Sequence, residues 1–338
     1  MKAAIYRGIK HIDLVDLPMP TCDDNGIVVK NTYAAICGSD IAAYLHGGDD
    51  NMIWKDHEFG HEMASVVTAV GKNAAKQGIR VGDRLFVYGP AAKGDIMRAA
   101  TVGGFSEYME VMNVVLDQTV FRLPDSLSDK LASIIEPFTI GANAAMRLEP
   151  QPGKKAIVYG AGAIGLTAAV TLKYKGCQVV VVDLVESRLE LARSLGLMTC
   201  NLTQEDYLER CCALLGGMQT LFGQTVIDCD YYVDAAGNQA VLDNFFRGAK
   251  GDAALSVVAM HHKEVRLNLI PLTISGFKII GAAGGGTDII RLCIEILASG
   301  KFPMENLITH EFAHKDIVAA FEQACNAEES TKVVIKYE

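Results

Sequence analysis

Three short segments near the start of the chain carry side chains that could bind a metal ion. They hold Cys37 in Cys-Gly-Ser-Asp, His61 with Glu62 in Gly-His-Glu, and Glu136 in Glu-Pro. Together they supply one thiolate, one imidazole and one or two carboxylates, a mixed set that zinc takes in catalytic sites with one position left open. Soft sulfur beside imidazole argues against magnesium or calcium. Each residue alone is more typical of packing or solvation, so both interpretations stay open at this point.

Two other histidines compete for the same role. His46 follows the cysteine segment, and His57 lies four residues before His61, a spacing that would place both on one face of a helix. Gly60 and the β-branched run after Ala64 favour instead a loop that leads into a strand. We therefore expect a loop and a strand here rather than a helical histidine pair.

A glycine-rich motif opens the second part of the chain. The run Gly160-Ala-Gly162-Ala163-Ile164-Gly165 is G-x-G-x-x-G, placed after a strand-like segment and at the start of a helix-like one. Gly160 permits a tight turn, Gly162 lets the backbone approach a pyrophosphate, and Gly165 lets helix and strand pack closely. The helix N-terminus offers N–H groups and a partial positive charge to the phosphates. The pattern therefore indicates a dinucleotide-binding site; the alternative is an ordinary turn between a strand and a helix.

An acidic residue strengthens that interpretation. Asp183 ends the next expected strand, 23 residues after Gly160, where an acid bonds the adenosine ribose and repels a 2′-phosphate. This favours NAD over NADP. The next basic residue is Arg188, which we expect along the adenosine edge or paired with Glu186 or Glu190 on a solvated helix face.

Two kinds of element must position these residues. Residues 1–147 contain short β-like runs separated by turns, which predict a mainly antiparallel β domain with a few helices; the runs lie at 27–31, 64–70, 84–87 and 108–111. From residue 155 onward, strands and helices alternate, which predicts βαβ units with a parallel sheet and an α/β fold. The strands are 156–159, 179–183, 231–235 and 254–258, and the helices 163–175 and 186–195.

The last fifty residues differ again. Residues 289–299 and 315–326 are expected to be helices, and 332–336 a final strand. Such a tail could extend the parallel sheet or fold back on the first domain. The resemblance described below favours folding back.

Composition narrows the class of protein. A length of 338 residues suits two domains, and a net charge of -9 disfavours nucleic acid or an anionic membrane as partner. Nine cysteines with no Cys-x-x-Cys pair indicate reduced thiols. The chain begins without the pattern of a signal peptide and has no apolar run long enough to span a membrane. We therefore expect a cytoplasmic protein.

The metal-binding segments and the glycine motif occur in the same order in a known family. The whole chain resembles the zinc-containing medium-chain dehydrogenase/reductases, or alcohol dehydrogenases, in their sorbitol, polyol and threonine dehydrogenase branch. The resemblance implies a GroES-like catalytic domain over 1–147, completed by 288–338, and a Rossmann NAD-binding domain over 148–287. It also implies an active site in the cleft between the domains and a homodimer or homotetramer.

The resemblance also implies roles for individual residues. Cys37 and His61 match zinc ligands, and Glu62 and Glu136 match carboxylates that bind zinc directly or through water. Ser39 matches a hydroxyl that passes the substrate proton toward solvent. The positions that match the lining of the nicotinamide site are Ala236, Val258 and Met260.

Three departures from the family pattern qualify these roles. Residues 88–104 lack the four cysteines that many members use for a second, structural zinc, so we predict one zinc ion per chain. Ala42 stands where many members have histidine, so the proton relay beyond Ser39 is open and His46 or His57 could substitute. Residues 214–228 form a longer connection than usual, as a surface loop or an oligomer contact.

The predicted function follows from both lines of reasoning. The chain is expected to transfer hydride between NAD and a secondary hydroxyl of a polyol, sugar acid or cyclitol, with zinc at the reacting oxygen. Two carboxylates at the metal are typical of family members that act on polyols and sugars, so this choice of substrate rests on the resemblance alone. The alternatives are a zinc-independent, quinone-reductase-like enzyme and a dinucleotide-binding protein without catalysis. A measurement of bound zinc distinguishes these hypotheses, because only the zinc-dependent dehydrogenase is expected to hold the ion.

Overall fold

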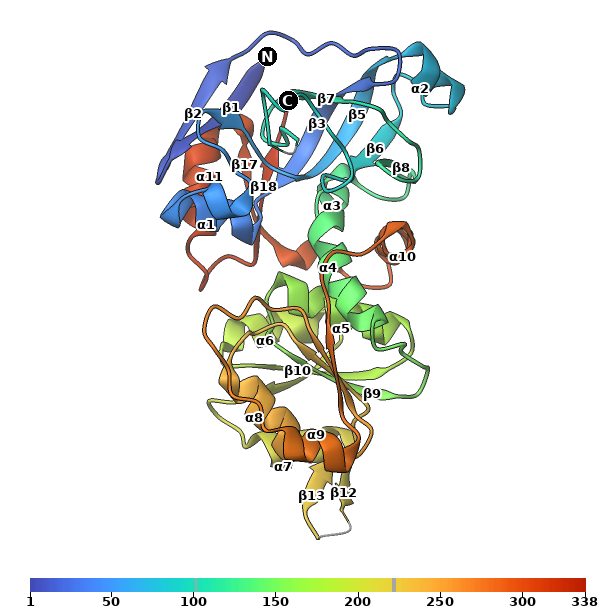
Figure 1. Ribbon diagram of the computed structural model, residues 1–338, viewed down its shortest axis with the longest axis vertical. Helices are drawn as coiled ribbons and strands as arrows, with labels where there is room; N and C mark the ends of the chain where they lie inside the picture. The colour runs from blue at the N-terminus through green and yellow to red at the C-terminus, as the bar shows by residue number, and fades with distance from the viewer. Residues whose placement is uncertain (101, 221–222) are drawn as a thin grey trace. The chain divides into compact units, whose positions relative to one another are not determined.

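The computed structural model describes residues 1–100, 102–220 and 223–338, and it divides into two compact units. The first unit consists of Met1–Pro137 and Leu307–Glu338, and the second of Phe138–Asn306. The tail of the chain thus belongs to the first unit, as the blue and red ribbons of Figure 1 show.

The two units divide at other positions than the expected 147/148 and 287/288. Helix α4 (Ile135–Met146) begins in the first unit and ends in the second. Its Gly141 packs so closely on the second unit that an added Cβ would collide with Thr167. Helix α10 (Thr287–Ala298) belongs to the second unit, where the hydroxyl of Tyr174 donates to Glu295 at 2.6 Å. All of α10 and most of α4 therefore lie within the compact second unit.

The first unit is built on β-sheets. A three-stranded antiparallel sheet has the order β2 (His11–Asp16), β1 (Lys2–Gly8), β4 (His57–Glu58). The larger, seven-stranded sheet is antiparallel except for one parallel pair, β17 with β18. Its order is β17 (Ile308–Ala313), β18 (Lys332–Lys336), β3 (Ile27–Ala35), β5 (Glu62–Val70), β6 (Arg84–Val87), β8 (Val120–Arg122), with β7 (Tyr108–Val111) beside β3.

The end of the chain completes the core of this unit. Strand β18 pairs with β3, and helix α11 (Ile317–Ala324) brings Phe321 into an aromatic cluster. The ring of Phe321 lies 5.7 Å from Phe59 and 5.5 Å from Phe105, and the latter two rings are 4.9 Å apart. Buried aromatic rings at these distances contribute both apolar burial and edge-to-face contact.

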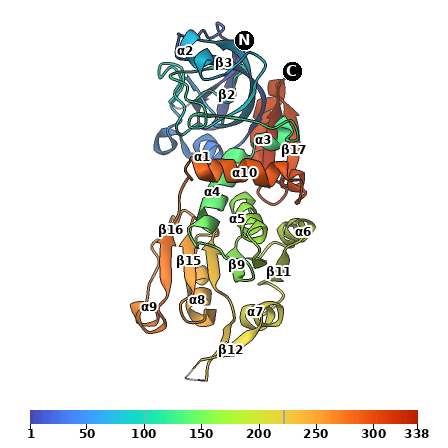
Figure 2. The same ribbon diagram turned by 90° about the vertical axis from the view of Figure 1, so that its right-hand side faces the viewer.

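The second unit is a doubly wound α/β domain. Its six-stranded parallel sheet has the order β11 (Met198–Asn201), β10 (Gln178–Asp183), β9 (Lys155–Tyr159), β14 (Tyr231–Asp234), β15 (Ala254–Val257), β16 (Lys278–Gly281). Figures 1 and 2 show helices on both faces, which explains why β9 and β10 are continuous apolar runs. The remaining helices are α5 (Ala163–Tyr174), α6 (Glu186–Ser194), α7 (Tyr207–Leu215), α8 (Gln239–Gly248) and α9 (Leu269–Ser275).

The strand order of this sheet fixes where a ligand can bind. From β9 the chain first winds outward through β10 and β11, then returns to the other side of β9 at β14. In such sheets ligands bind beyond the carboxyl ends of the strands, at the point where the winding reverses. The glycine motif follows β9 directly and therefore lies at that point.

The long connection at 214–228 is an antiparallel hairpin. Its strands are β12 (Gly217–Gln219) and β13 (Thr225–Ile227), with β12 exposed along its length. Figure 1 shows the hairpin extending away from the six-stranded sheet. Leu221 and Phe222, which belong to the same predicted segment, lie outside the described residues. In the part of the chain that the structure describes, no helix has both the length and the apolar character of a membrane span.

Candidate metal centre and dinucleotide site

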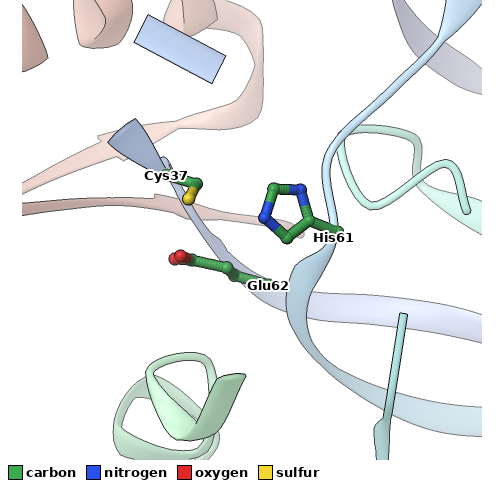
Figure 3. Close-up of side chains that lie close together, drawn as sticks. All are labelled: Cys37, His61 and Glu62. Carbon is green, nitrogen blue, oxygen red and sulfur yellow. The ribbon is translucent and has the colours of Figure 1, made fainter. Parts of the chain in front are cut away.

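Three of the candidate ligands come together in the first unit. Potential ligand atoms of Cys37, His61 and Glu62 all lie within 4.8 Å of one another. Figure 3 shows the thiol, the imidazole and the carboxylate surrounding one small space. Within residues 1–100, 102–220 and 223–338 this is the only such group of three or more metal-binding side chains. Two segments separated in the sequence are therefore brought into one donor set.

Local structure explains why these side chains converge. Cys37 has an extended backbone and immediately precedes helix α1 (Gly38–His46), and its N–H donates to the Asp40 carboxylate at 2.9 Å. Glu62 is the first residue of β5, with His61 just before it. Gly60 has a φ of +95°, and a Cβ there would come within 2.6 Å of the Phe105 ring. Glycine thus permits the turn that presents both side chains.

The loop expected between His57 and His61 is confirmed. His57 lies on β4, where its Nδ1 is 2.8 Å from the carbonyl oxygen of Lys55 and its ring meets Trp54 edge-on. His46 is exposed at the end of α1. Neither histidine belongs to the metal-binding cluster. Ser39 lies in the first turn of α1, two residues after Cys37, and is partly exposed.

Buried acids give the cluster its electrostatic character. Asp40 is 1% exposed, and burial raises its pKa to about 6 although His61 opposes this. Burial alone would lower the pKa of His61, but Asp40, 3.9 Å from its Nδ1, and Cys37 raise it well above its usual value. Metal binding requires thiolate, carboxylate and a free imidazole nitrogen, so a cation would displace protons from this site.

One unpartnered oxygen supports the fit to a metal ion. Oε1 of Glu62 is buried and has no hydrogen-bond partner in the described structure. A buried polar atom left without a partner is costly. Beside a thiol and an imidazole, this oxygen completes the mixed donor set that suits zinc. The residues present therefore fit the metal that their types predict.

Glu136 lies near the cluster but is not one of its three members. It is in the first turn of α4 and 6% exposed. Burial, followed by the charge of Glu62, raises its pKa to about 7. The structure thus brings the third sequence segment within electrostatic reach of Glu62 and His61, outside the group whose atoms lie within 4.8 Å of one another.

Sequence reasoning missed one residue of this site. Lys332, at the start of β18, is only 7% exposed, and its Nζ lies 2.5 Å from Oε2 of Glu62. The same ammonium donates to the carbonyl oxygen of Ile36 at 2.9 Å. Burial opposes its charge, but Glu62 and Cys37 outweigh this and raise the pKa of Lys332. The available signal was a lysine directly before the apolar run of residues 333–335.

The second unit has a cavity of about 530 Å³ at the predicted dinucleotide site. Gly160, with a φ of +97°, and Gly162 line it, as the sequence led us to expect. Gly165 is buried in the first turn of α5, and a Cβ there would collide with the carbonyl oxygen of Gly160. Ala163 and Ile164 lie in the same turn, partly buried. The tight turn and close packing of the motif are therefore present.

Asp183 and Arg188 both line this cavity. One oxygen of Asp183 accepts from the N–H of Ala161 at 2.6 Å, and the other accepts from Leu184 and Val185. These bonds fix the carboxylate at the end of β10, beside the glycine loop. Glu186 pairs with Arg193. Arg188 is among the residues that line the cavity, and its place along the adenosine stays a prediction.

The predicted nicotinamide residues follow the next two strands. Ala236 lines the cavity after β14, whereas Val258 and Met260 follow β15, and Met260 is 81% exposed. Asp234, which was not predicted from the sequence, contacts the loops after both strands. Its Oδ1 accepts from the N–H of Ala236 and of Gly237, and its Oδ2 lies 2.8 Å from Nε2 of His261.

Both units match known protein families. Residues 23–125 match the family described as alcohol dehydrogenase GroES-like domain, and residues 163–299 match the family described as zinc-binding dehydrogenase. Each match covers more than half of one compact unit. The two matched families are the two kinds of domain that the sequence resemblance implied.

Named relatives match along almost the whole chain. Sorbitol dehydrogenase of Bacillus subtilis is 28% identical, over 100% of this chain and 97% of its own length. L-galactonate-5-dehydrogenase of Escherichia coli is 29% identical, over 95% of this chain and 94% of its own. A solved Escherichia coli structure, described as a short chain alcohol dehydrogenase complexed with NADH, is 26% identical with a TM-score of 0.81 over 99% of both chains.

Proposed function

Because this chain belongs to the polyol branch of the zinc-containing medium-chain dehydrogenase/reductase family, we propose that it transfers hydride between NAD and a secondary hydroxyl of a polyol, sugar acid or cyclitol. The observation that carries the proposal is the convergence of Cys37, His61 and Glu62. The similarity to a sorbitol and an L-galactonate dehydrogenase supports a substrate with several hydroxyl groups.

The first unit would hold the metal ion. Cys37, His61 and Glu62 are the proposed ligands, and a zinc ion that they hold would keep a position open for the substrate oxygen. When bound, zinc supplies a Lewis acid that makes a hydroxyl more acidic or polarises a carbonyl. Asp40, with one oxygen 3.9 Å from Nδ1 of His61, would place a negative charge beside the imidazole. Glu136 would bind the ion directly or through water.

Ser39 is the proposed carrier of the substrate proton. Ser39 lies in the first turn of α1, two residues after Cys37, and it is partly exposed. A hydroxyl can accept a proton on one lone pair while donating its own to water. Since Ala42 has no group that could continue a relay, we propose that Ser39 passes the proton to solvent.

The second unit would hold the cofactor. The N–H groups at the start of α5 would bind the pyrophosphate, and Asp183 the adenosine ribose, with Arg188 at the edge of the cavity. The carboxylate of Asp183 would repel a 2′-phosphate, which supports NAD over NADP. When bound, NAD supplies the hydride acceptor. Ala236, Val258 and Met260 are the proposed neighbours of the nicotinamide.

We propose a single zinc ion per chain. Residues 88–104 contain no cysteine, and a buried ion pair supports this stretch instead. Arg98 donates to both oxygens of Glu58, at 2.6 and 3.1 Å, and the hydroxyl of Ser106 donates to Glu58 at 2.5 Å. A bidentate pair on a buried carboxylate is a strong, directional contact. Thr101 lies outside the described residues.

Metal content and activity test the proposal together. We expect about one zinc ion per purified chain and NADH formation with part of a panel of polyols, sugar acids and cyclitols, abolished by a chelator. Cys37→Ala and His61→Ala should each lose both zinc and turnover. Cys22→Ala, a half-buried cysteine of the same unit outside the cluster, is the matched control and should keep both. Full activity of either ligand variant without metal would overturn the assignment.

A further inference from the structure

We propose that Lys332 is a positioning residue of the metal centre, whose buried ammonium holds one oxygen of Glu62 and thereby limits how strongly Glu62 binds the metal ion. The inference rests on the proposed zinc site, and it assigns the last strand of the chain a part in tuning that site. Lys332 is not itself a ligand, because an ammonium group has no lone pair to offer.

The contacts of Lys332 place it between two ligand-bearing segments. Its Nζ lies 2.5 Å from Oε2 of Glu62 and donates to the carbonyl oxygen of Ile36, the residue before Cys37, at 2.9 Å. One oxygen of Glu62 is therefore occupied by the ammonium group. The other, Oε1, is buried and has neither a hydrogen-bond partner nor an ion pair in the described structure.

The charge around Lys332 explains why a lysine is buried here. The carboxylates of Asp40, Glu62 and Glu136 are all at least nine-tenths buried and lie within electrostatic reach of Lys332. Lysine is almost never fully buried unless it is paired. Lys332 forms such a pair with Glu62. It therefore places a fixed positive charge beside these buried acids.

A fixed positive charge beside a divalent cation has two opposing consequences. It repels the metal ion and competes with it for Glu62, which weakens binding of the metal. It also reduces the negative charge around the substrate oxygen, which favours loss of the hydroxyl proton. Replacing the ammonium by an apolar group should therefore tighten metal binding and slow turnover. A residue that served packing alone would, when replaced, impair both.

Lys332→Met tests this separation in the full-length protein. The zinc dissociation constant is measured by competition with a chelator, and the visible absorption of the Co²⁺-substituted protein reports the ligand set. We expect Lys332→Met to bind zinc at least about tenfold more tightly, to alter the Co²⁺ spectrum and to lower kcat. Lys332→Arg keeps the charge and should restore values near wild type. Lys336→Met, exposed on the same strand, is the matched control.

The outcomes distinguish this inference from the proposed function. If the wild-type protein binds no zinc, the proposed function fails. If it binds zinc, and Lys332→Met shows the wild-type zinc affinity and Co²⁺ spectrum, or weaker binding, only the role of Lys332 is refuted. Should Lys332→Met fail to fold, Lys332→Gln takes its place, because an amide still donates to Ile36 but carries no charge. The same tightening of zinc binding is then expected.

Discussion

Among single side chains, Asp183 carries the clearest test of cofactor choice. Its carboxylate accepts three backbone N–H groups while facing the cavity of the second unit. Asp183→Asn keeps an oxygen acceptor and removes the charge that would repel a 2′-phosphate. We expect the ratio of kcat/KM for NAD to that for NADP to fall roughly tenfold to a hundredfold, since hydrogen bonds to charged groups contribute about 1.5–3 kcal/mol.

Initial rates with both cofactors measure this ratio. Asp288→Asn, at an exposed position on α10, is the control and should leave it unchanged. An unaltered ratio in Asp183→Asn would remove the ribose-binding role from Asp183. The result would leave the metal centre untouched, because that centre lies in the other unit.

At the scale of elements, substitutions of two glycines in one motif are expected to impair different properties of the protein. A Cβ on Gly165 would collide with backbone of Gly160, whereas a Cβ on Gly162 would meet nothing within 4 Å. Gly165→Ala should therefore destabilise the protein by about 1–3 kcal/mol, as overpacking does. Gly162→Ala should leave stability unchanged but weaken NADH binding, because its Cβ occupies space meant for the pyrophosphate.

Urea unfolding of the cofactor-free protein and fluorescence titration with NADH separate the two effects. Gly281→Ala, at another uncrowded position of the second unit, serves as control for both measurements. Equal losses of stability in Gly162→Ala and Gly165→Ala would contradict this division of roles.

Elements with strong local signals could be predicted from the sequence. The strands at 84–87, 108–111 and 332–336 were predicted with their observed bounds, because turns or charged residues flank short apolar runs. The hairpin at 217–227 was expected only as a long connection, since each of its strands has only three residues and β12 is exposed. The unit boundaries depend on packing of α4 and α10, which no local pattern records.

The residues of the metal centre also differ in how far the sequence could predict them. Cys37, His61 and Glu62 belong to recognisable motifs, so their residue types pointed to them before any geometry was known. Lys332 contacts them only through the fold, from nearly 300 positions along the chain: its partner Ile36 is 296 residues away. Long-range pairs of this kind carry no sequence periodicity, and a single lysine in a strand is ordinary.

For the whole molecule, the exposed face of α9 supports the proposed homo-oligomer. Leu269, Ile270 and Ile274 are 56%, 65% and 70% exposed, and α9 has no buried residue. The neighbouring β16 is an edge strand of the parallel sheet. Apolar patches of this kind mark interaction surfaces, and an open strand edge invites pairing. We propose that a second copy of this chain covers them.

Light scattering during size-exclusion chromatography tests this surface. The wild-type chain is expected to elute as a dimer or tetramer, and Ile270→Lys with Ile274→Lys as a monomer that retains its zinc. Ile9→Lys, at a position 59% exposed in the first unit, should not change the mass. A monomeric wild type, or a double variant of unchanged mass, would remove α9 from the interface.

The return of the chain to its first unit also sets an order of events during synthesis. Residues 307–338 are synthesised after the whole second unit, and only they supply β17, β18, Phe321 and Lys332. The second unit is one continuous segment and can fold before they appear. Until then the larger sheet of the first unit is incomplete and its buried acids lack the lysine. The metal centre is therefore completed only after the second unit has been synthesised.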